Sequence, residues 1–491
     1  MTSETQRYLE ARLEARRRST WIQVAALAGA AACIAAAALL QPPINRQRRD
    51  LQLVLGSDIY RELPPKYAWI SAAGGTFRGI AADILWARAE SLKQEGKYYE
   101  SHQLAKWICT LQPRFPQVWT FQAWNMSYNI SVATHTPRER WQWVYNGIRL
   151  LRDEGIPNNE RSVLLYHQLA WIWSHKVGNR ADDFHWVSKR EGAAIMVRLL
   201  GPPPAGLRDA ETIAWFRPVA EAPPTLAELV RQRPGISGLV DGLAGAGVDV
   251  EASTSNDRLL HPLEERFFNP YTAYRLDRQL ADLRPQTPAD ARRESPHAAL
   301  WTLLDEAPPD DLAALLAFLR AKVLREQYKM DPRYMLDLTG GLGTDEPVPI
   351  DWRTPWAQAM YWAKYGVEKA TGVKAAKEMD LLNTDRILLN SLSDLCSQGL
   401  YTFRVNLDEP GESFLAAGPD IRYIEAMHRK YLELGRKYAE KGEDVGETAG
   451  ETLRSGHVNH LRSAVVALYL AGRKDQARHY LEYQAINYKD L

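Results

Sequence analysis

Residues 96–130, GKYYESHQLAKWICTLQPRFPQVWTFQAWNMSYNI, decide the fold class that we expect for this chain of 491 residues. Apolar side chains recur in this stretch at the spacing that gathers them on one face of an α-helix. They are Leu104, Trp107, Ile108 and Leu111, then Trp119, Ala123, Met126 and Ile130. Alternation with a period of two, which is typical of strands, is hard to find anywhere in the chain. The sequence therefore predicts an all-α body.

Start and stop signals separate the expected helices. Thr136 to Glu139 is a capping box with proline at the first helical position, and Gly155 stands where that helix is expected to end. Gly96 marks the end of an earlier helix. Because helices joined by short turns pack as antiparallel neighbours, we expect a succession of helical hairpins.

The hairpin around Gly96 resembles a tetratricopeptide repeat. Its turn glycine, following aromatic residue, late apolar residue and terminal proline have the spacing of that repeat, and the next helix supplies the early Trp and the small residue of a second one. These residues are Gly96, Tyr98, Leu111, Pro113, Trp119 and Ala123. The resemblance covers roughly residues 82–115, with a degenerate continuation to about residue 178. It implies an α-solenoid that presents a concave surface to protein partners.

The resemblance has departures and one further partial match. Ser101 and Ala89 stand where the repeat usually has Ala and Gly. Near the C-terminus, Gly472 and Ala477 keep the interval between the turn glycine and the following alanine. The overall pattern also resembles membrane-anchored helical proteins of planctomycete-type bacteria, a resemblance that implies no activity.

Composition divides the chain into six segments. They are a basic tail at 1–20, an apolar run at 21–40, a linker at 41–76, repeat-like helices at 77–200, a Pro/Gly-rich insertion with short helices at 201–300, and a helical region at 301–491 that ends in a repeat-like hairpin. The insertion includes three consecutive prolines at 202–204 and a glycine-rich stretch at 242–247.

The run at 21–40 is long enough to cross a membrane. Gln23 is its one strongly polar residue, and at about 1.5 Å per residue a helix of this length spans roughly 30 Å. A secretory signal peptide is the alternative, but its apolar core usually has roughly 7–15 residues. We expect a retained single-pass anchor in the lipid bilayer of the bacterial inner membrane. Five arginines before the run favour a cytoplasmic N-terminus and a periplasmic body.

Charge and cysteine content exclude several classes of protein. Sixty-one Lys plus Arg stand against 60 Asp plus Glu, which gives no electrostatic reason to expect a nucleic acid as partner. The three cysteines, Cys33, Cys109 and Cys396, include no close pair, so a disulfide framework and a Cys-rich zinc site are excluded. Neither a P-loop nor an H-E-x-x-H motif occurs, and we expect no metal and no cofactor.

Two groups of residues are candidates for ligand binding. Ten of the 16 Trp lie between Trp69 and Trp186. Those on the apolar stripes, Trp107, Trp119 and Trp141, are expected in the core. Trp124, Trp143 and Trp173 lie off the stripes and are candidates to face a ligand. The second group is Asp351, Trp352 and Arg353, directly before a helix start. Arg353 either binds a carboxylate or peptide terminus, or pairs with Asp351 and locks the loop onto the helix.

These features favour a binding protein over an enzyme. We expect a membrane-anchored scaffold for a protein or peptide partner, with its groove formed by the stacked helices. The alternative is an enzyme on an α/α helical scaffold that acts on envelope glycans, because glycosidases use paired carboxylates. A deep pocket with two carboxylates roughly 5–10 Å apart would favour that alternative.

Overall fold

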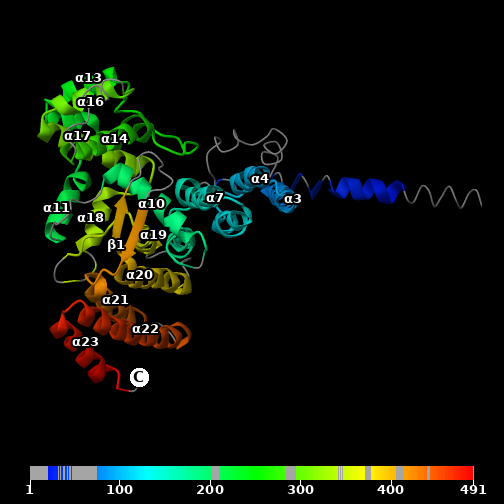
Figure 1. Ribbon diagram of the computed structural model, residues 1–491. Coiled ribbons are helices and arrows are strands. Elements are labelled where there is room, and N and C mark those ends of the chain that lie inside the picture. The colour runs from blue at the N-terminus through cyan, green and yellow to red at the C-terminus, as the bar shows by residue number, and fades with distance from the viewer. Residues whose placement is uncertain are drawn as a thin grey trace, which may run out of the picture. The chain divides into compact units, whose positions relative to one another are not determined.

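A computed structural model describes most of the body of the protein (Figure 1). The described residues are 20–30, 75–180, 182–201, 209–283, 295–340, 342, 344, 347–370, 378–404, 414–439 and 443–489, with scattered positions between 32 and 46. The chain divides into two compact units, Met1–Ile84 and Leu85–Leu491, and helix α3, Gly75–Gln94, runs across the boundary.

The expected anchor falls in the first unit. Part of the run at 21–40, the basic tail before residue 20 and almost all of the linker lie outside the described residues. Across the residues that the structure does describe, no helix combines the length and the hydropathy that a bilayer crossing requires.

The second unit is mostly helical, as predicted. Its first part contains α-helices interrupted by single turns of π-helix, labelled η. The elements are α3 Gly75–Gln94, α4 Tyr98–Leu111, α5 Pro116–Trp124, η2 Asn125–Ile130, α6 Ser131–Ala133, α7 Pro137–Arg149, η3 Leu150–Gly155, α8 Ile156–Asn158, α9 Val163–Trp171, η4 Ile172–Val177 and α10 His185–Leu200. The capping box is confirmed, because Thr136 Oγ1 accepts the backbone N–H of Glu139 at 3.2 Å. Gly155 does not end that helix, which continues through η3 into α8.

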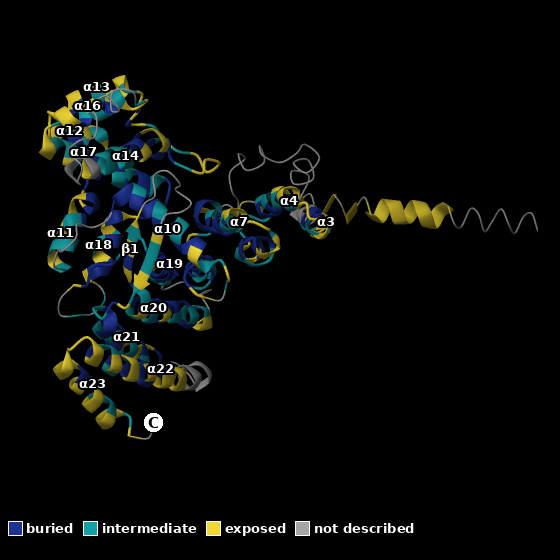
Figure 2. Cartoon of the chain, in the orientation of Figure 1, coloured by how far each residue is buried: buried dark blue, intermediate teal, exposed yellow. Residues whose placement is uncertain are grey.

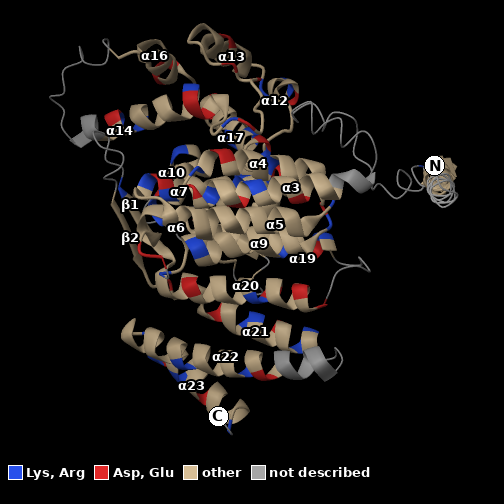
Figure 3. Cartoon of the chain, turned by 90° about the vertical axis from the view of Figure 1, so that its right-hand side faces the viewer, with Lys and Arg blue, Asp and Glu red and all other residues tan. Residues whose placement is uncertain are grey.

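A stack of helices forms the centre of the unit. α5 packs on α9, α9 on α19, and α19 to α23 follow one another (Figure 3). The later helices are α19 Pro355–Ala370, α20 Glu378–Gln398, α21 Tyr423–Ala439, α22 Glu443–Leu470 and α23 Lys474–Asn487. Buried residues concentrate in α9, α19 and α20, whereas α22 and α23 expose much of their outer faces (Figure 2). The stack therefore joins residues from both halves of the sequence.

A middle lobe interrupts the stack between α10 and α19. It contains α11 Asp209–Ala220, α12 Leu226–Gln232, α13 Ile236–Gly245, η5 Glu264–Phe268, α14 Asn269–Leu283, α16 Ala298–Glu306, α17 Pro309–Glu326 and α18 Pro332–Gly340. α13 packs on α16 and α17, and α11 packs on α17 and α18. The Pro/Gly-rich stretch thus forms part of a helical lobe that reaches to Gly340.

One small sheet corrects the expectation of an all-α body. Strands β1 Leu400–Arg404 and β2 Phe414–Gly418 pair antiparallel, with Leu400 opposite Gly418 and Arg404 opposite Phe414. β1 has strand-forming Tyr, Thr and Phe, but β2 reads FLAAG, a run with no polar alternation. Five residues are too few for a period-two pattern to stand out from the helical sequence around them.

The joint between α9 and α19 gives a prediction about the stack. A Cβ added at Gly366 would lie 2.6 Å from Tyr166 Cγ, and the Tyr166 side chain is buried. We expect Gly366→Ala to lower the free energy of unfolding by about 1 to 3 kcal/mol, because neither helix can move away without losing other contacts. Urea denaturation of the full chain measures the change.

Gly435 in α21 is the matched control. A Cβ there would have no heavy atom within 4 Å. Because alanine lowers the conformational entropy of the unfolded chain, we expect Gly435→Ala to be neutral or to stabilise the protein by up to about 1 kcal/mol. If Gly366→Ala is as well tolerated as Gly435→Ala, the close packing of α9 on α19 is wrong.

Candidate functional site

The three candidate tryptophans lie in different environments. Trp124 is 40% exposed and its ring lies between those of Phe121 and Tyr128, with centroids 6.3 and 6.0 Å away. Trp143 is 2% exposed. Its ring packs against Tyr99, with centroids 5.2 Å apart, which places Trp143 in the core. Trp173 is 6% exposed and reaches a small internal cavity.

Asp351 and Arg353 form the ion pair that the sequence indicates. Arg353 Nε donates to Asp351 Oδ1 at 2.9 Å and Nη2 donates to Oδ2 at 2.6 Å. The same Nη2 donates to the backbone oxygen of Tyr401 in β1 at 3.0 Å. Arg353 therefore ties the loop before α19 to the sheet. Because Asp351 occupies its fork, Arg353 has no bidentate site left for a ligand carboxylate.

An equivalent pair stands before α21, where sequence analysis did not single it out. Arg422 Nε donates to Asp420 Oδ1 at 2.8 Å, Nη2 donates to Oδ2 at 2.6 Å, and Nη1 donates to Asp209 at 2.6 Å. Both arginines line one cavity of about 140 Å³, together with the buried ring of Trp352. The shared signal is Asp-x-Arg at a helix start. Since both guanidinium groups are paired with carboxylates, we interpret the residues around this cavity as structural and not as a ligand site.

A larger cleft of about 1010 Å³ lies between α7, α10, α14, the loop at 259–260 and β1. Apolar and aromatic side chains cover much of its wall. They are Trp141, Tyr145, Val187, Ala194, Ile195, Val197, Leu259, Leu260, Ala273 and Phe403. The Trp141 and Tyr145 rings stack at 5.4 Å with planes 22° apart. Trp141 lies on the predicted core stripe of α7, yet it is only half-buried and borders the cleft.

The polar lining of the cleft carries an excess of positive charge. Arg138, Arg190 and Arg198 line it, and Glu191 is the one carboxylate among the described residues of its lining. Arg190 Nη2 lies 3.5 Å from Glu191 Oε1, and its guanidinium lies 5.3 Å from the centre of the Trp186 ring. The cleft therefore offers cationic groups beside an aromatic and apolar wall, an arrangement that suits an amphipathic anionic ligand.

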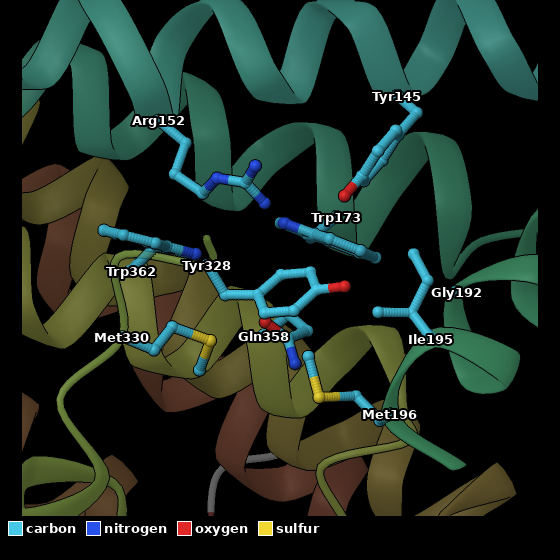
Figure 4. Close-up of a pocket in the computed structure, with 10 residues that line it drawn as sticks. All are labelled: Tyr145, Arg152, Trp173, Gly192, Ile195, Met196, Tyr328, Met330, Gln358 and Trp362. Atoms are coloured by element: carbon cyan, nitrogen blue, oxygen red, sulfur yellow. The ribbon is translucent and has the colours of Figure 1, made fainter. Parts of the chain in front are cut away.

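A second, much smaller cavity lies behind the wall of this cleft (Figure 4). Its volume of about 10 Å³ is just enough for a single water molecule. The lining residues are Tyr145, Arg152, Trp173, Gly192, Ile195, Met196, Tyr328, Met330, Gln358 and Trp362. Tyr145 and Ile195 line both spaces, so their side chains form the partition between the cleft and this inner cavity.

Arg152 is the charged group of the inner cavity. It is 3% exposed, and its Nε and Nη2 donate to Asp153 Oδ1 and Oδ2 at 2.6 and 3.0 Å. The guanidinium also lies 5.4 Å from the ring centre of Tyr328. In Figure 4 the indole nitrogen of Trp173 points toward this guanidinium. Trp173 Nε1 is buried and has no hydrogen-bond partner among the described residues.

A hydrogen-bonded chain extends from Tyr328 into the middle lobe. The Tyr328 hydroxyl donates to Glu264 Oε1 at 2.6 Å, and the backbone N–H of His261 donates to Glu264 Oε2 at 2.9 Å. Burial raises the pKa of Glu264, although these hydrogen bonds and nearby Arg198 oppose the shift. His261 Nε2 in turn lies 3.0 Å from Glu326 Oε2. The wall of the inner cavity is thus fixed by a buried polar network.

Three turns of π-helix position this network. Arg152 belongs to η3, Trp173 to η4 and Glu264 to η5. A π-turn shifts side chains around the helix axis, costs stability and recurs at functional sites. Two of these turns line the cavity and the third holds Tyr328 in its wall, which marks this region as a candidate site. Of Arg152, Trp173 and Glu264, only Trp173 was a candidate from the sequence, because no local pattern predicts where a π-turn occurs.

A separate cluster of histidines is buried between α21, α22 and α23. His428 Nδ1 lies 2.8 Å from His457 Nε2, and His457 Nδ1 lies 2.6 Å from the Tyr488 hydroxyl. His460 Nε2 lies 3.0 Å from the backbone oxygen of Ile424. In the described part of the chain, no three His, Cys, Asp or Glu side chains are placed to hold a metal ion. The cluster is therefore a buried hydrogen-bonded group of the C-terminal helices.

No family model, curated protein or solved structure matches the chain in sequence or structure comparisons.

Proposed function

We propose that this protein is a membrane-anchored, tetratricopeptide-like scaffold whose cleft binds a peptide segment of a protein partner. The observation that carries the proposal is the cleft of about 1010 Å³ with its aromatic wall and excess of arginine. Its volume is at the upper end of ligand-binding pockets, which is room for several residues of a peptide. The helical stack supplies the rigid support that such a cleft needs.

The chemistry of the wall selects the kind of peptide. The stacked rings of Trp141 and Tyr145 offer flat apolar area at little entropic cost. Arg138 and Arg198 line the cleft, and an arginine guanidinium can bind a carboxylate in a bidentate way. A peptide with both aromatic and acidic residues fits this combination best.

Binding is favoured over glycan hydrolysis by the carboxylates of the cavities. A glycosidase needs two carboxyl groups roughly 5–10 Å apart in one pocket. Among the described residues, one carboxylate, Glu191, lines the cleft, one, Asp351, lines the cavity beside Arg353, and none lines the inner cavity. Glu191 and Asp351 each lie beside an arginine.

The run at 21–40 supports a place for this scaffold at the bacterial inner membrane. Its length suits a single span, and the arginines before it favour a periplasmic body. Tethering would raise the effective concentration of the cleft for partners in the same membrane, so a modest affinity for each peptide suffices.

Peptide arrays test the cleft directly. The full chain in detergent is applied to an array of random peptides grouped by charge and aromatic content. We expect retention on peptides that combine Asp or Glu with an aromatic residue, and at least a tenfold loss in affinity for Trp141→Ala, since a central aromatic anchor is worth 2 kcal/mol or about 30-fold.

Trp124→Ala is the matched comparison, because Trp124 is an exposed tryptophan that does not line the cleft. Thermal unfolding of both variants separates lost contacts from lost stability. Weaker binding by Trp124→Ala together with unchanged binding by Trp141→Ala would place the peptide on the surface around Trp124 and contradict the cleft.

A further inference from the structure

The partition between the cleft and the inner cavity is thin. Tyr145 and Ile195 border both spaces. Gly192 lies in the same wall, because a Cβ added there would lie 3.3 Å from Trp173 Cζ3 and 3.8 Å from Trp141 Cη2. Trp141 lines the cleft and Trp173 lines the inner cavity. The two rings approach each other on either side of Gly192, which has no side chain to place between them. A group bound in the cleft thus lies one side-chain layer from Arg152.

The inner cavity has more hydrogen-bond donors than acceptors. Trp173 Nε1 is a buried donor without a partner in the described structure. Gln358 Nε2 gives one of its two hydrogens to the backbone oxygen of Trp352 at 3.2 Å. Arg152 has five N–H groups, and its hydrogen bonds to Asp153 and to the Tyr145 hydroxyl occupy only part of them. An unpaired buried donor costs free energy, so an acceptor atom between these groups is stabilised.

The charges around the cavity also favour an anion. Arg152 lines the cavity, Arg149 lies 3.5 Å from Asp153, and Arg198 interacts with Glu264. The opposing carboxylates are Asp153, which pairs with Arg152, and Glu264, which accepts hydrogen bonds from Tyr328 and from the backbone of His261. Three guanidinium groups thus stand against two carboxylates, and Arg152, Asp153 and Glu264 are buried. A buried charge of opposite sign interacts strongly under such conditions.

We propose that the inner cavity is the subsite for the terminal carboxylate of the peptide, with one carboxylate oxygen in place of a water molecule. This proposal rests on the proposed function of the cleft. The oxygen accepts from Trp173 Nε1 and from the Arg152 guanidinium, which form charge-assisted hydrogen bonds. The carboxylate oxygen takes the place of the Tyr145 hydroxyl beside the guanidinium, while the Tyr145 ring keeps its stack on Trp141. The cleft then binds the C-terminal end of a partner protein, and the side chain of the partner's last residue packs against Trp141.

N-acetylphenylalanine and N-acetylphenylalaninamide test the subsite, because they differ only in the terminal group. Isothermal titration calorimetry of the full chain in detergent measures both affinities. We expect the acid to bind at least tenfold more tightly than the amide. Trp173→Phe removes the indole donor and keeps an aromatic ring, so it is expected to abolish most of this preference.

Trp352→Phe is the matched control for the stability cost of the variant, because Trp352 is a buried tryptophan outside the inner cavity. The proposal is overturned if acid and amide bind with equal affinity, or if the preference for the acid survives in Trp173→Phe. The inner cavity would then be a site for a water molecule only. If neither compound binds although acidic aromatic peptides bind through Trp141, the carboxylate subsite is wrong and the peptide-binding function stands. Loss of peptide binding altogether contradicts the function itself.

Discussion

Asp153→Ala is expected to lower the free energy of unfolding by about 3 to 5 kcal/mol, because it leaves the buried guanidinium of Arg152 without its counter-ion. The Asp153 side chain also lies 3.5 Å from Arg149 Nε, so two cations lose a partner. Removal of one member of a buried pair costs far more than the pair contributes, since the remaining charge is desolvated.

Replacement of both members is the control. The double variant Arg152→Met and Asp153→Leu removes the charges together and fills the same volume with apolar atoms. Such replacements are often neutral or stabilising, so we expect the double variant to recover most of the loss. Urea unfolding of both variants measures the difference. If the double variant is as unstable as Asp153→Ala, the loss arises from packing around η3 and not from the stranded charge.

Acid is expected to destabilise the C-terminal helices through the histidine cluster. Burial lowers the pKa of His457 to about 3 and the pKa of His460 to about 4, against an ordinary value of 6.5. Both are therefore neutral in the folded chain at pH values where the unfolded chain binds protons. Their contribution to stability is present above about pH 6.5 and is lost as the pH falls from there toward 4. Two such groups remove about 3 kcal/mol per pH unit across that window.

Thermal unfolding between pH 7.5 and pH 4.5 measures this dependence. His457→Gln keeps a neutral hydrogen-bonding side chain near His428 and Tyr488, so we expect a shallower loss of stability with acid. His135→Gln is the control, because His135 is exposed and outside the cluster. α23 packs chiefly on α22, so it is expected to detach first. Identical pH profiles for the wild type and His457→Gln would contradict the role of the cluster.

Local features of the fold could be predicted because their causes are local. The hairpin turns at Gly96 and Gly472 have φ of 75° and 78°, a left-handed conformation in which glycine meets no steric penalty. Thr136 caps its helix, and Trp119 is buried as its apolar stripe predicts. Arg353 pairs with Asp351 because a spacing of two residues lets the guanidinium of Arg353 reach the carboxylate of Asp351.

The site could not be predicted in the same way. The cleft is assembled from α7, α10, α14 and β1, and the residues that meet there are distant in sequence. Trp141 belongs to a core stripe by its spacing, yet it is only half-buried and borders the cleft. Trp143, two residues later, points to the opposite side and is buried. Arg152 stands in a π-turn, where the helical period itself changes.

The packing of α9 on α19 has a consequence for biosynthesis. α9 carries the buried residues Val163, Leu165, Tyr166, Leu169 and Ala170, and α19 is one of its main partners. The ribosome must translate the whole middle lobe before that partner emerges, so the nascent chain carries an uncovered apolar helix for much of its synthesis. Long-range closure of this kind slows folding and exposes the chain to aggregation. A fragment that stops before α19 should therefore depend on chaperones to remain in solution.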